Sequence, residues 1–294
     1  MDWSHFGIAR RPYWPVVDTG SYFPAATHET ALAGIGAAFA RRDPVVLLDG
    51  PAGTGKSLIA RLWLERLPEA TSRIVLANLQ SPSPADLLQA ILFDLNLPYR
   101  GLSEQELRLV VTEHLLTQSA NASSTVLVID EAQNLGSTAL EEIRLLGNIE
   151  SQGGTALFTV LVAQPRIQEL LKHSECASFA QRIGAKCHLE ALTSEESIAY
   201  LRHQSNAAAI DDEAVALLAG ACQGIARLLN RVTTCAAELA MEAGAETIDV
   251  EAALEAISRL GLEAKEAADD AIVLKHPGRA SKKPKQRVAR KKSA

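Results

Sequence analysis

The sequence has 294 residues, of which 47% are apolar and 22% charged, which is ordinary for a soluble globular protein and leaves room for one large domain or two modest ones. Its longest apolar stretches, such as ALFTVLVA, are far shorter than the ~18 residues that cross a bilayer, and its N-terminus lacks the basic start and apolar run of a secretion signal. We therefore expect a cytoplasmic protein without a transmembrane span. Because the four cysteines form no C-x-x-C pair, we expect neither a redox motif nor a zinc ribbon.

The N-terminal segment, residues 1–27, is rich in aromatic residues and proline. It holds six of the thirteen aromatic residues of the chain, among them Tyr13 and Trp14, with prolines between them. We expect an ordered, non-helical segment that packs near the nucleotide site described below. Helical spacing of apolar residues then predicts a helix over 30–40.

From residue 28 to 191, apolar segments of strand length alternate with segments of helical spacing. Strands are predicted over 45–49, 73–79, 124–130, 156–163 and 186–190, and helices over 56–67, 84–95, 103–119 and 137–151. Ser103, with Glu106 three residues later, forms the capping box of one of these helices. Apolar strands separated by helices predict an α/β core with a parallel sheet covered on both faces.

After Leu192 the strand pattern stops, and residues 192–262 are predicted to form a small all-α domain. Thr193 and Glu196 form a second capping box at its start. Helices are predicted over 194–206, 212–222, 226–243 and 250–260.

Residues 263–294 form a tail that we expect to be disordered. Its last twenty residues, 275–294, hold nine Lys/Arg and no acid, so residues 1–274 carry 20 basic and 35 acidic residues, a net charge of −15. Such a tail suits a phosphate backbone or an anionic membrane surface, and equally a purely solubilising end. Because no aromatic residue is interleaved, any contact with nucleic acid would not depend on sequence.

The stretch DGPAGTGKSL matches the phosphate-loop pattern G-x-x-x-x-G-K-[ST] in full and lies between a predicted strand and a predicted helix. Glycines let backbone N–H groups turn toward phosphate oxygens, and the helix N-terminus adds partial positive charge. Lys56 is expected to reach the β- and γ-phosphates and Ser57 to hold Mg²⁺. The predicted nucleotide-binding residues of this loop are Gly50, Pro51, Ala52, Gly53, Thr54, Gly55, Lys56, Ser57 and Leu58.

The stretch VLVIDEAQ supplies two adjacent carboxylates at the end of an apolar strand. A central strand of a parallel sheet delivers its last residues beside the phosphate loop. There Asp130 is expected to bind the Mg²⁺ shell, and Glu131 to orient and deprotonate the attacking water. The sequence therefore predicts a nucleotide triphosphate site with a catalytic base.

Three further polar residues are candidates for contact with the nucleotide. Gln164 ends the fourth predicted strand, where it can contact water or the γ-phosphate or simply cap the strand. Arg182 precedes the fifth predicted strand, and Arg227 opens a helix of the C-terminal domain. By position alone, each arginine suits either the phosphates or a surface ion pair.

The chain resembles the ExeA/GspA-type AAA+ ATPases, which are related to transposition ATPases such as TniB and MuB. The resemblance covers about residues 3–260. It rests on the segments HFGIARRPYW, GPAGTGKS, VLVIDEAQNL, LEEIRLLGNIES, LVAQPRIQELL, FAQRIGAKCHLEALTSEESIAYL and GIARLLNRV. It implies a P-loop NTPase with a RecA-like AAA+ core and a helical lid, and ATP rather than GTP as the nucleotide.

The resemblance also implies roles for individual residues. Arg182 becomes an arginine finger that acts in trans on the ATP of a neighbouring subunit, Arg227 a lid arginine that senses the γ-phosphate, and Gln164 the first sensor. In that architecture Tyr22, Phe23 and His28 are candidates for the adenine wall, and a cluster of core aromatic residues is the alternative.

Three functions are compatible with these features. The first is an Mg²⁺-dependent ATPase that assembles into homo-oligomers through ATP and works as a motor or assembly factor on a secretion or membrane partner. The second is a transposition helper that loads on double-stranded DNA, in part through the basic tail. The third is a slow nucleotide-gated switch, which the presence of Glu131 disfavours. The −15 charge of residues 1–274 disfavours extensive DNA coating, so we rank the motor first.

Overall fold

The computed structural model describes residues 6, 18–151, 154–205 and 209–263. Tyr13, Trp14 and the basic tail lie outside these residues, so the expectations about them are not tested. Within the described part of the chain, no helix combines the length and the apolar character needed to cross a bilayer.

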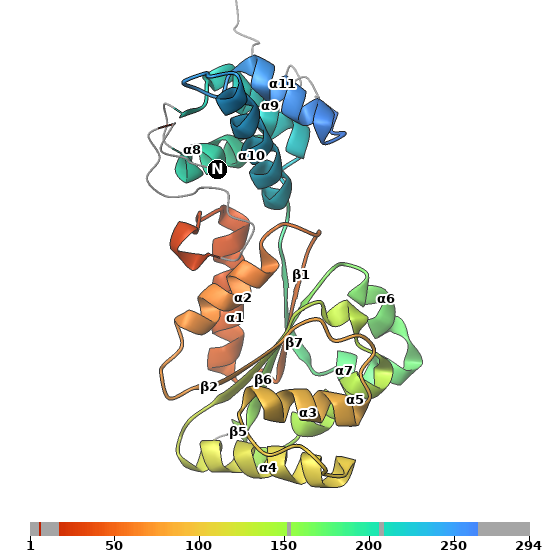
Figure 1. Ribbon diagram of the computed structural model, residues 1–294. Coiled ribbons are helices and arrows are strands. Elements are labelled where there is room, and N and C mark those ends of the chain that lie inside the picture. Colours follow the sequence, from red (N-terminus) through yellow and green to blue (C-terminus); the bar gives the residue numbers. More distant parts are fainter. Residues whose placement is uncertain (1–5, 7–17, 152–153, 206–208, 264–294) are drawn as a thin grey trace, which may run out of the picture.

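A five-stranded parallel sheet forms the centre of the α/β region (Figure 1). Its strands are, in spatial order, β2 (Ser72–Leu76), β3 (Thr125–Ile129), β6 (Leu157–Ala163), β1 (Val45–Asp49) and β7 (Ile183–His188). Every residue of β1, β3 and β6 is buried, whereas residues of the edge strands β2 and β7 alternate between less and more exposed positions. Continuous apolar strands are those covered on both faces, which is why their sequence pattern predicts a parallel sheet.

Helices cover both faces of the sheet (Figure 1). On one face lie α1 (Ala26–Arg41) and α2 (Lys56–Glu65), and on the other α3 (Pro84–Asp94), α4 (Glu104–Ala120), α5 (Ser137–Leu146), α6 (Ile167–Lys172) and α7 (Ala177–Ala180). Each face has its own apolar core: Val46, Val128 and Val160 pack under α1 and α2, and Leu47 and Leu127 under the other layer. The predicted arrangement of helix, sheet and helix is therefore confirmed.

The C-terminal region is helical and has a separate core (Figure 1). It consists of α8 (Ser194–Gln204), α9 (Asp212–Cys222), α10 (Ala226–Glu242) and α11 (Val250–Arg259). Both predicted capping boxes are present, with Ser103 Oγ accepting from Glu106 N at 3.4 Å and Thr193 Oγ1 accepting from Glu196 N at 3.1 Å. These caps fix where α4 and α8 begin.

Several predicted boundaries are wrong. The helix predicted over 137–151 ends at Leu146, because Gly147 and the polar, glycine-rich residues after it favour a turn over further helix. An antiparallel pair, β4 (Glu150–Ser151) and β5 (Gly154–Thr155), follows instead. Strand β2 ends at Leu76 rather than at residue 79, and β7 begins at Ile183 rather than at residue 186.

Short elements went unpredicted because they hold too few residues to establish a period. They are α6, α7 and the 3₁₀ turns η2 (Thr19–Ser21), η3 (Ala132–Asn134) and η4 (Ser174–Cys176).

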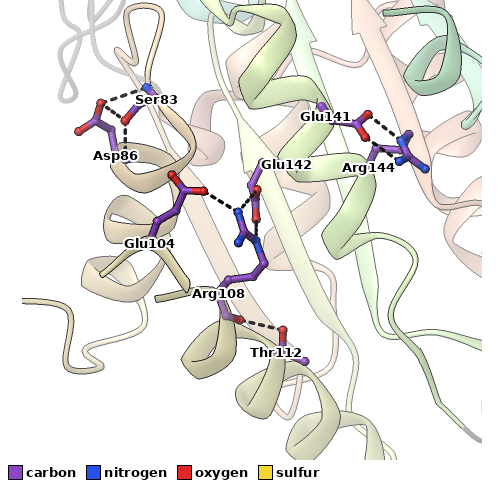
Figure 2. A network of polar contacts seen from close by, with 8 residues as sticks. All are labelled: Ser83, Asp86, Glu104, Arg108, Thr112, Glu141, Glu142 and Arg144. Carbon is purple, nitrogen blue, oxygen red and sulfur yellow. Dashed lines mark hydrogen bonds and ion pairs between the residues drawn. The ribbon is translucent and has the colours of Figure 1, made fainter. Parts of the chain in front are cut away.

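An ion pair between the partly exposed Arg108 and the buried Glu142 joins α4 to α5, on the opposite face of the sheet from α2 (Figure 2). Arg108 donates from Nε and Nη2 to the two oxygens of Glu142, both at 2.8 Å, and Nη2 also donates to Glu104 at 2.9 Å. Glu142 is only 2% exposed, and the hydrogen bonds to Glu142 and Glu104 raise the pKa of the Arg108 guanidinium. This pair holds two helices of one layer together.

Arg108→Ala is expected to lower the free energy of unfolding by about 3 kcal/mol, because it leaves the Glu142 carboxylate buried without its partner. We expect the melting temperature to fall by roughly 6–12 °C in a chain of this size. The matched control is Arg144→Ala, which breaks the more exposed Arg144–Glu141 pair and should cost about 1 kcal/mol or less (Figure 2). Equal losses in thermal denaturation of the two variants would contradict the importance of the Arg108–Glu142 pair.

Candidate nucleotide site

The predicted phosphate loop connects the end of β1 at Asp49 to the start of α2 at Lys56. Gly53 lies in the left-handed region with φ +84°, and a Cβ atom there would lie 2.9 Å from Arg227 Cβ and from Ile225 Cγ2. Only glycine fits this close approach between the loop and the helical region. The first N–H groups of α2 face the loop without intrahelical partners, which makes this end of the helix suited to an anion.

Lys56 lies inside the loop and is 9% exposed. Its Nζ donates to Gly50 O at 2.9 Å and to Pro51 O at 2.7 Å. Burial lowers the pKa of Lys56, and the nearby carboxylates of Glu131 and Asp130 act in the opposite direction. Two carbonyl oxygens of the loop backbone thus hold the lysine ammonium in place.

Ser57 and Asp130 come together from the two predicted motifs. Ser57 Oγ donates to Asp130 Oδ2 at 2.6 Å, across 73 residues of sequence. A hydroxyl and a carboxylate are the hard oxygen ligands that Mg²⁺ accepts beside phosphates. The residues present therefore fit an Mg²⁺ ion at this position.

Glu131 directly follows Asp130 and has left-handed backbone angles, φ 55° and ψ 37°. This conformation is uncommon for a residue with a side chain, and such backbone strain gathers at functional sites. Gln164 Nε2 donates to Glu131 Oε2 at 3.1 Å, and Gln133 Nε2 donates to the same oxygen. Two side-chain amides therefore orient the Glu131 carboxylate, and both donate to the same oxygen, Oε2.

Gln164 lies beside these carboxylates because β6 pairs with β3. Its backbone N–H donates to Gln133 Oε1 at 2.8 Å. Gln133 thus bridges the end of β6 and the side chain of Glu131. Gln133 is the last residue of the VLVIDEAQ stretch, but its role was not predicted because nothing in the spacing shows which way its amide points.

Arg227 lies against the phosphate loop. Its backbone N–H donates to Gly53 O at 3.1 Å, and its side chain is exposed at the start of α10. The helical region therefore contacts the loop through the residue that sequence analysis singled out.

Arg182 lies elsewhere. It immediately precedes β7, which runs parallel to β1, so it lies at the opposite end of the sheet from the loop, roughly 15–20 Å away along the strands. Its side chain is exposed. Within one chain, Arg182 does not join the site.

Two of the three aromatic candidates lie together, since the ring centroids of Tyr22 and His28 are 6.2 Å apart, and Phe23 packs elsewhere. Tyr22 Oη donates to Glu29 at 2.7 Å, and Phe23 packs edge-on against Tyr200 of α8 with ring centroids 5.8 Å apart. His28 lies against the loop itself, with Nε2 2.8 Å from Thr54 O. The structure therefore brings one of the three to the phosphate loop.

A second group of residues that sequence analysis missed surrounds Asp49, which is 7% exposed. Its carboxylate accepts from Gln168 Nε2 at 3.0 Å and lies 2.7 Å from His188 Nδ1. Its backbone carbonyl accepts from Leu189 N at 2.7 Å, and the Leu189 carbonyl lies 2.3 Å from where a Cβ would stand on Gly50. The loop is thereby packed directly on the strand that leads to the helical region.

Comparison with known proteins agrees with this architecture. The AAA domain family model matches residues 40–171. General secretion pathway protein A of Aeromonas hydrophila is 31% identical over 249 residues, which cover 83% of this chain and 45% of that protein. The chain therefore spans less than half the length of this curated relative.

Solved structures with a similar fold include the ORC2 protein of Aeropyrum pernix, with a TM-score of 0.67 at 18% identity over 88% of this chain and 71% of that one. Cdc6p of Pyrobaculum aerophilum has a TM-score of 0.69 at 18% identity, with the same coverage. The RuvB Holliday junction branch migration motor of Thermotoga maritima has a TM-score of 0.56 at 20% identity, over 80% of this chain and 68% of that one. At such identities the similarity concerns the fold alone.

Proposed function

Because the chain is an ExeA/GspA-like AAA+ protein with a P-loop α/β core and a helical C-terminal region, we propose that it binds and hydrolyses ATP with Mg²⁺ as an oligomeric motor or assembly factor. The observation that carries the proposal is the meeting of Ser57, Asp130 and Glu131 beside Lys56. A site that only bound nucleotide would not need a carboxylate placed as a base.

In the proposed reaction the loop N–H groups and Lys56 bind the phosphates and orient the γ-phosphoryl group. Ser57 and Asp130 would hold Mg²⁺, and the ion would supply positive charge to the phosphate oxygens. Glu131 orients a water molecule and takes its proton. The side chain of Gln164, bonded to Glu131, reports whether a γ-phosphate is present.

The helical region acts as a lid in this proposal. Arg227 lies in the first turn of α10 and contacts Gly53. A contact between its guanidinium and the γ-phosphate would therefore shift the whole helix. Loss of that contact after hydrolysis would change the lid angle. A secretion or membrane assembly, as the name of the curated relative suggests, is the proposed recipient of that motion.

Arg182 completes the site of a neighbouring subunit. Its exposed position at the far end of the sheet from its own loop supports action in trans. A guanidinium on the developing phosphoryl charge supplies stabilisation that appears only in the transition state. The proposed active species is therefore a homo-oligomer with ATP sites at subunit boundaries.

Arg182→Ala is expected to lower ATP turnover roughly 10- to 100-fold, the worth of a charged hydrogen bond, with little loss of ATP affinity. Mixing it with Lys56→Met subunits, which keep Arg182 but lose the phosphate contact, should give faster phosphate release than either variant alone. The control is Arg41→Ala, which removes an exposed arginine from the same end of the sheet. A mixture no faster than its components would contradict action in trans.

A further inference from the structure

His28 is the point at which α1 contacts the phosphate loop. The residue is 5% exposed, and its Nε2 lies 2.8 Å from the carbonyl oxygen of Thr54, 26 positions further along the chain. A Cβ atom placed on Gly55 would lie 3.3 Å from the same nitrogen. The imidazole is therefore packed directly on the peptide that joins Thr54 to Gly55.

The hydrogen bond fixes which nitrogen carries the proton. A carbonyl oxygen only accepts, so Nε2 donates and the neutral ring leaves Nδ1 as a bare acceptor. Nδ1 is buried, and among the described residues it has no hydrogen-bond partner. Burying an unpaired polar atom is unfavourable, and a leucine or phenylalanine would fill this space without that cost. The donor on Nε2 is the feature that a purely apolar packing residue would lack.

The orientation of one carbonyl determines the orientation of the next N–H. A trans peptide is planar, with C=O and N–H pointing in opposite directions, and the described residues include no cis peptide. Holding Thr54 O toward α1 turns the Gly55 N–H away from α1. Among the described residues, no acceptor pairs with that N–H, so it is available to an oxygen inside the loop.

The first turn of α1 is itself fixed from two sides. Ala26 N donates to Glu196 Oε1 of α8 at 3.0 Å, and Glu190 N, in the segment after β7, donates to Thr27 Oγ1 at 3.2 Å. The imidazole is thereby held in position relative to both the sheet and the helical region.

We propose that His28 is a positioning residue of the phosphate loop: its Nε2–H holds the Thr54–Gly55 peptide so that the Gly55 N–H faces the phosphates of a nucleotide. The inference rests on the proposed nucleotide-binding function. It assigns His28 to the phosphate end of the site and not to the adenine wall. The ligand group concerned is the β-phosphate region of a nucleoside di- or triphosphate.

Two variants of similar size and polarity test the inference. In His28→Gln the side-chain amide reaches the position of Nε2, whereas in His28→Asn it reaches only the position of Nδ1. We expect His28→Gln to bind MgADP within about twofold of the wild type, and His28→Asn to bind about tenfold more weakly, as expected for one lost hydrogen bond to a charged group. Binding is measured by calorimetric titration of the full chain, with the melting temperature without nucleotide as the control for folding.

The outcomes are distinct. Equal MgADP affinity for the Gln and Asn variants would overturn the assignment of His28. A parallel fall in affinity and in nucleotide-free melting temperature for both variants would likewise overturn it, because it would show a general packing role. Absence of MgADP binding by the wild-type chain would overturn the proposed function itself.

Discussion

Lys56→Met is expected to weaken MgATP binding at least roughly 100-fold and so to abolish turnover at ordinary ATP concentrations. Methionine matches the length of lysine and is apolar, so the variant removes the ammonium and its donors while still filling the space inside the loop. Hydrogen bonds to charged groups contribute about 1.5–3 kcal/mol each, and two lost contacts to phosphates amount to a factor of about 100 or more. Calorimetric titration with MgATP measures the loss.

Lys172→Met is the matched control for this variant. It removes the same charge from an exposed position at the end of α6 and should bind MgATP like the wild type. Retained affinity in Lys56→Met, with an unchanged melting temperature, would mean that the loop is not the phosphate site.

Glu131→Gln is expected to lower the rate of ATP hydrolysis by about 10²- to 10⁴-fold, the usual contribution of a general base, while ATP affinity stays within about twofold. Glutamine keeps the shape of the side chain, and its carbonyl oxygen still accepts from the amides of Gln133 and Gln164. The variant therefore removes the base and preserves its surroundings. Single-turnover phosphate release separates the chemical step from binding.

Glu169→Gln makes the same chemical change at an exposed position on α6 and should leave turnover unchanged. Hydrolysis by Glu131→Gln at the wild-type rate would exclude Glu131 as the base. Another group would then have to activate the attacking water.

Much of the fold follows from the sequence because the determining interactions are local. The all-buried strands β1, β3 and β6 have apolar runs that differ plainly from helical spacing, and capping boxes mark the starts of α4 and α8. The end of α5 at Leu146 was not predicted, because apolar residues continue at helical spacing past Gly147. That spacing alone does not show that a turn is more stable there than a further turn of helix.

In the candidate site too, some residues could be predicted from the sequence and others could not. The loop and the carboxylate pair are each contiguous in sequence, and the parallel sheet brings them together, so Lys56, Ser57, Asp130 and Glu131 could be predicted as a group. Gln133 could not, because its relevance depends on the direction of an amide. The resemblance placed His28 at the adenine wall, and its contact with the phosphate loop, 26 positions away, was not predicted. Such contacts depend on the packed structure, and no motif spacing reports them.

The most direct test is steady-state phosphate release by the wild-type chain with MgATP, with and without double-stranded DNA, against Glu131→Gln as background. We predict turnover well above that background and indifferent to DNA. Turnover that rises with DNA and falls as salt increases would support ATPase activity but contradict the proposed role as a secretion-type motor. Phosphate release no faster than that of Glu131→Gln under both conditions would contradict the central claim that this site hydrolyses ATP.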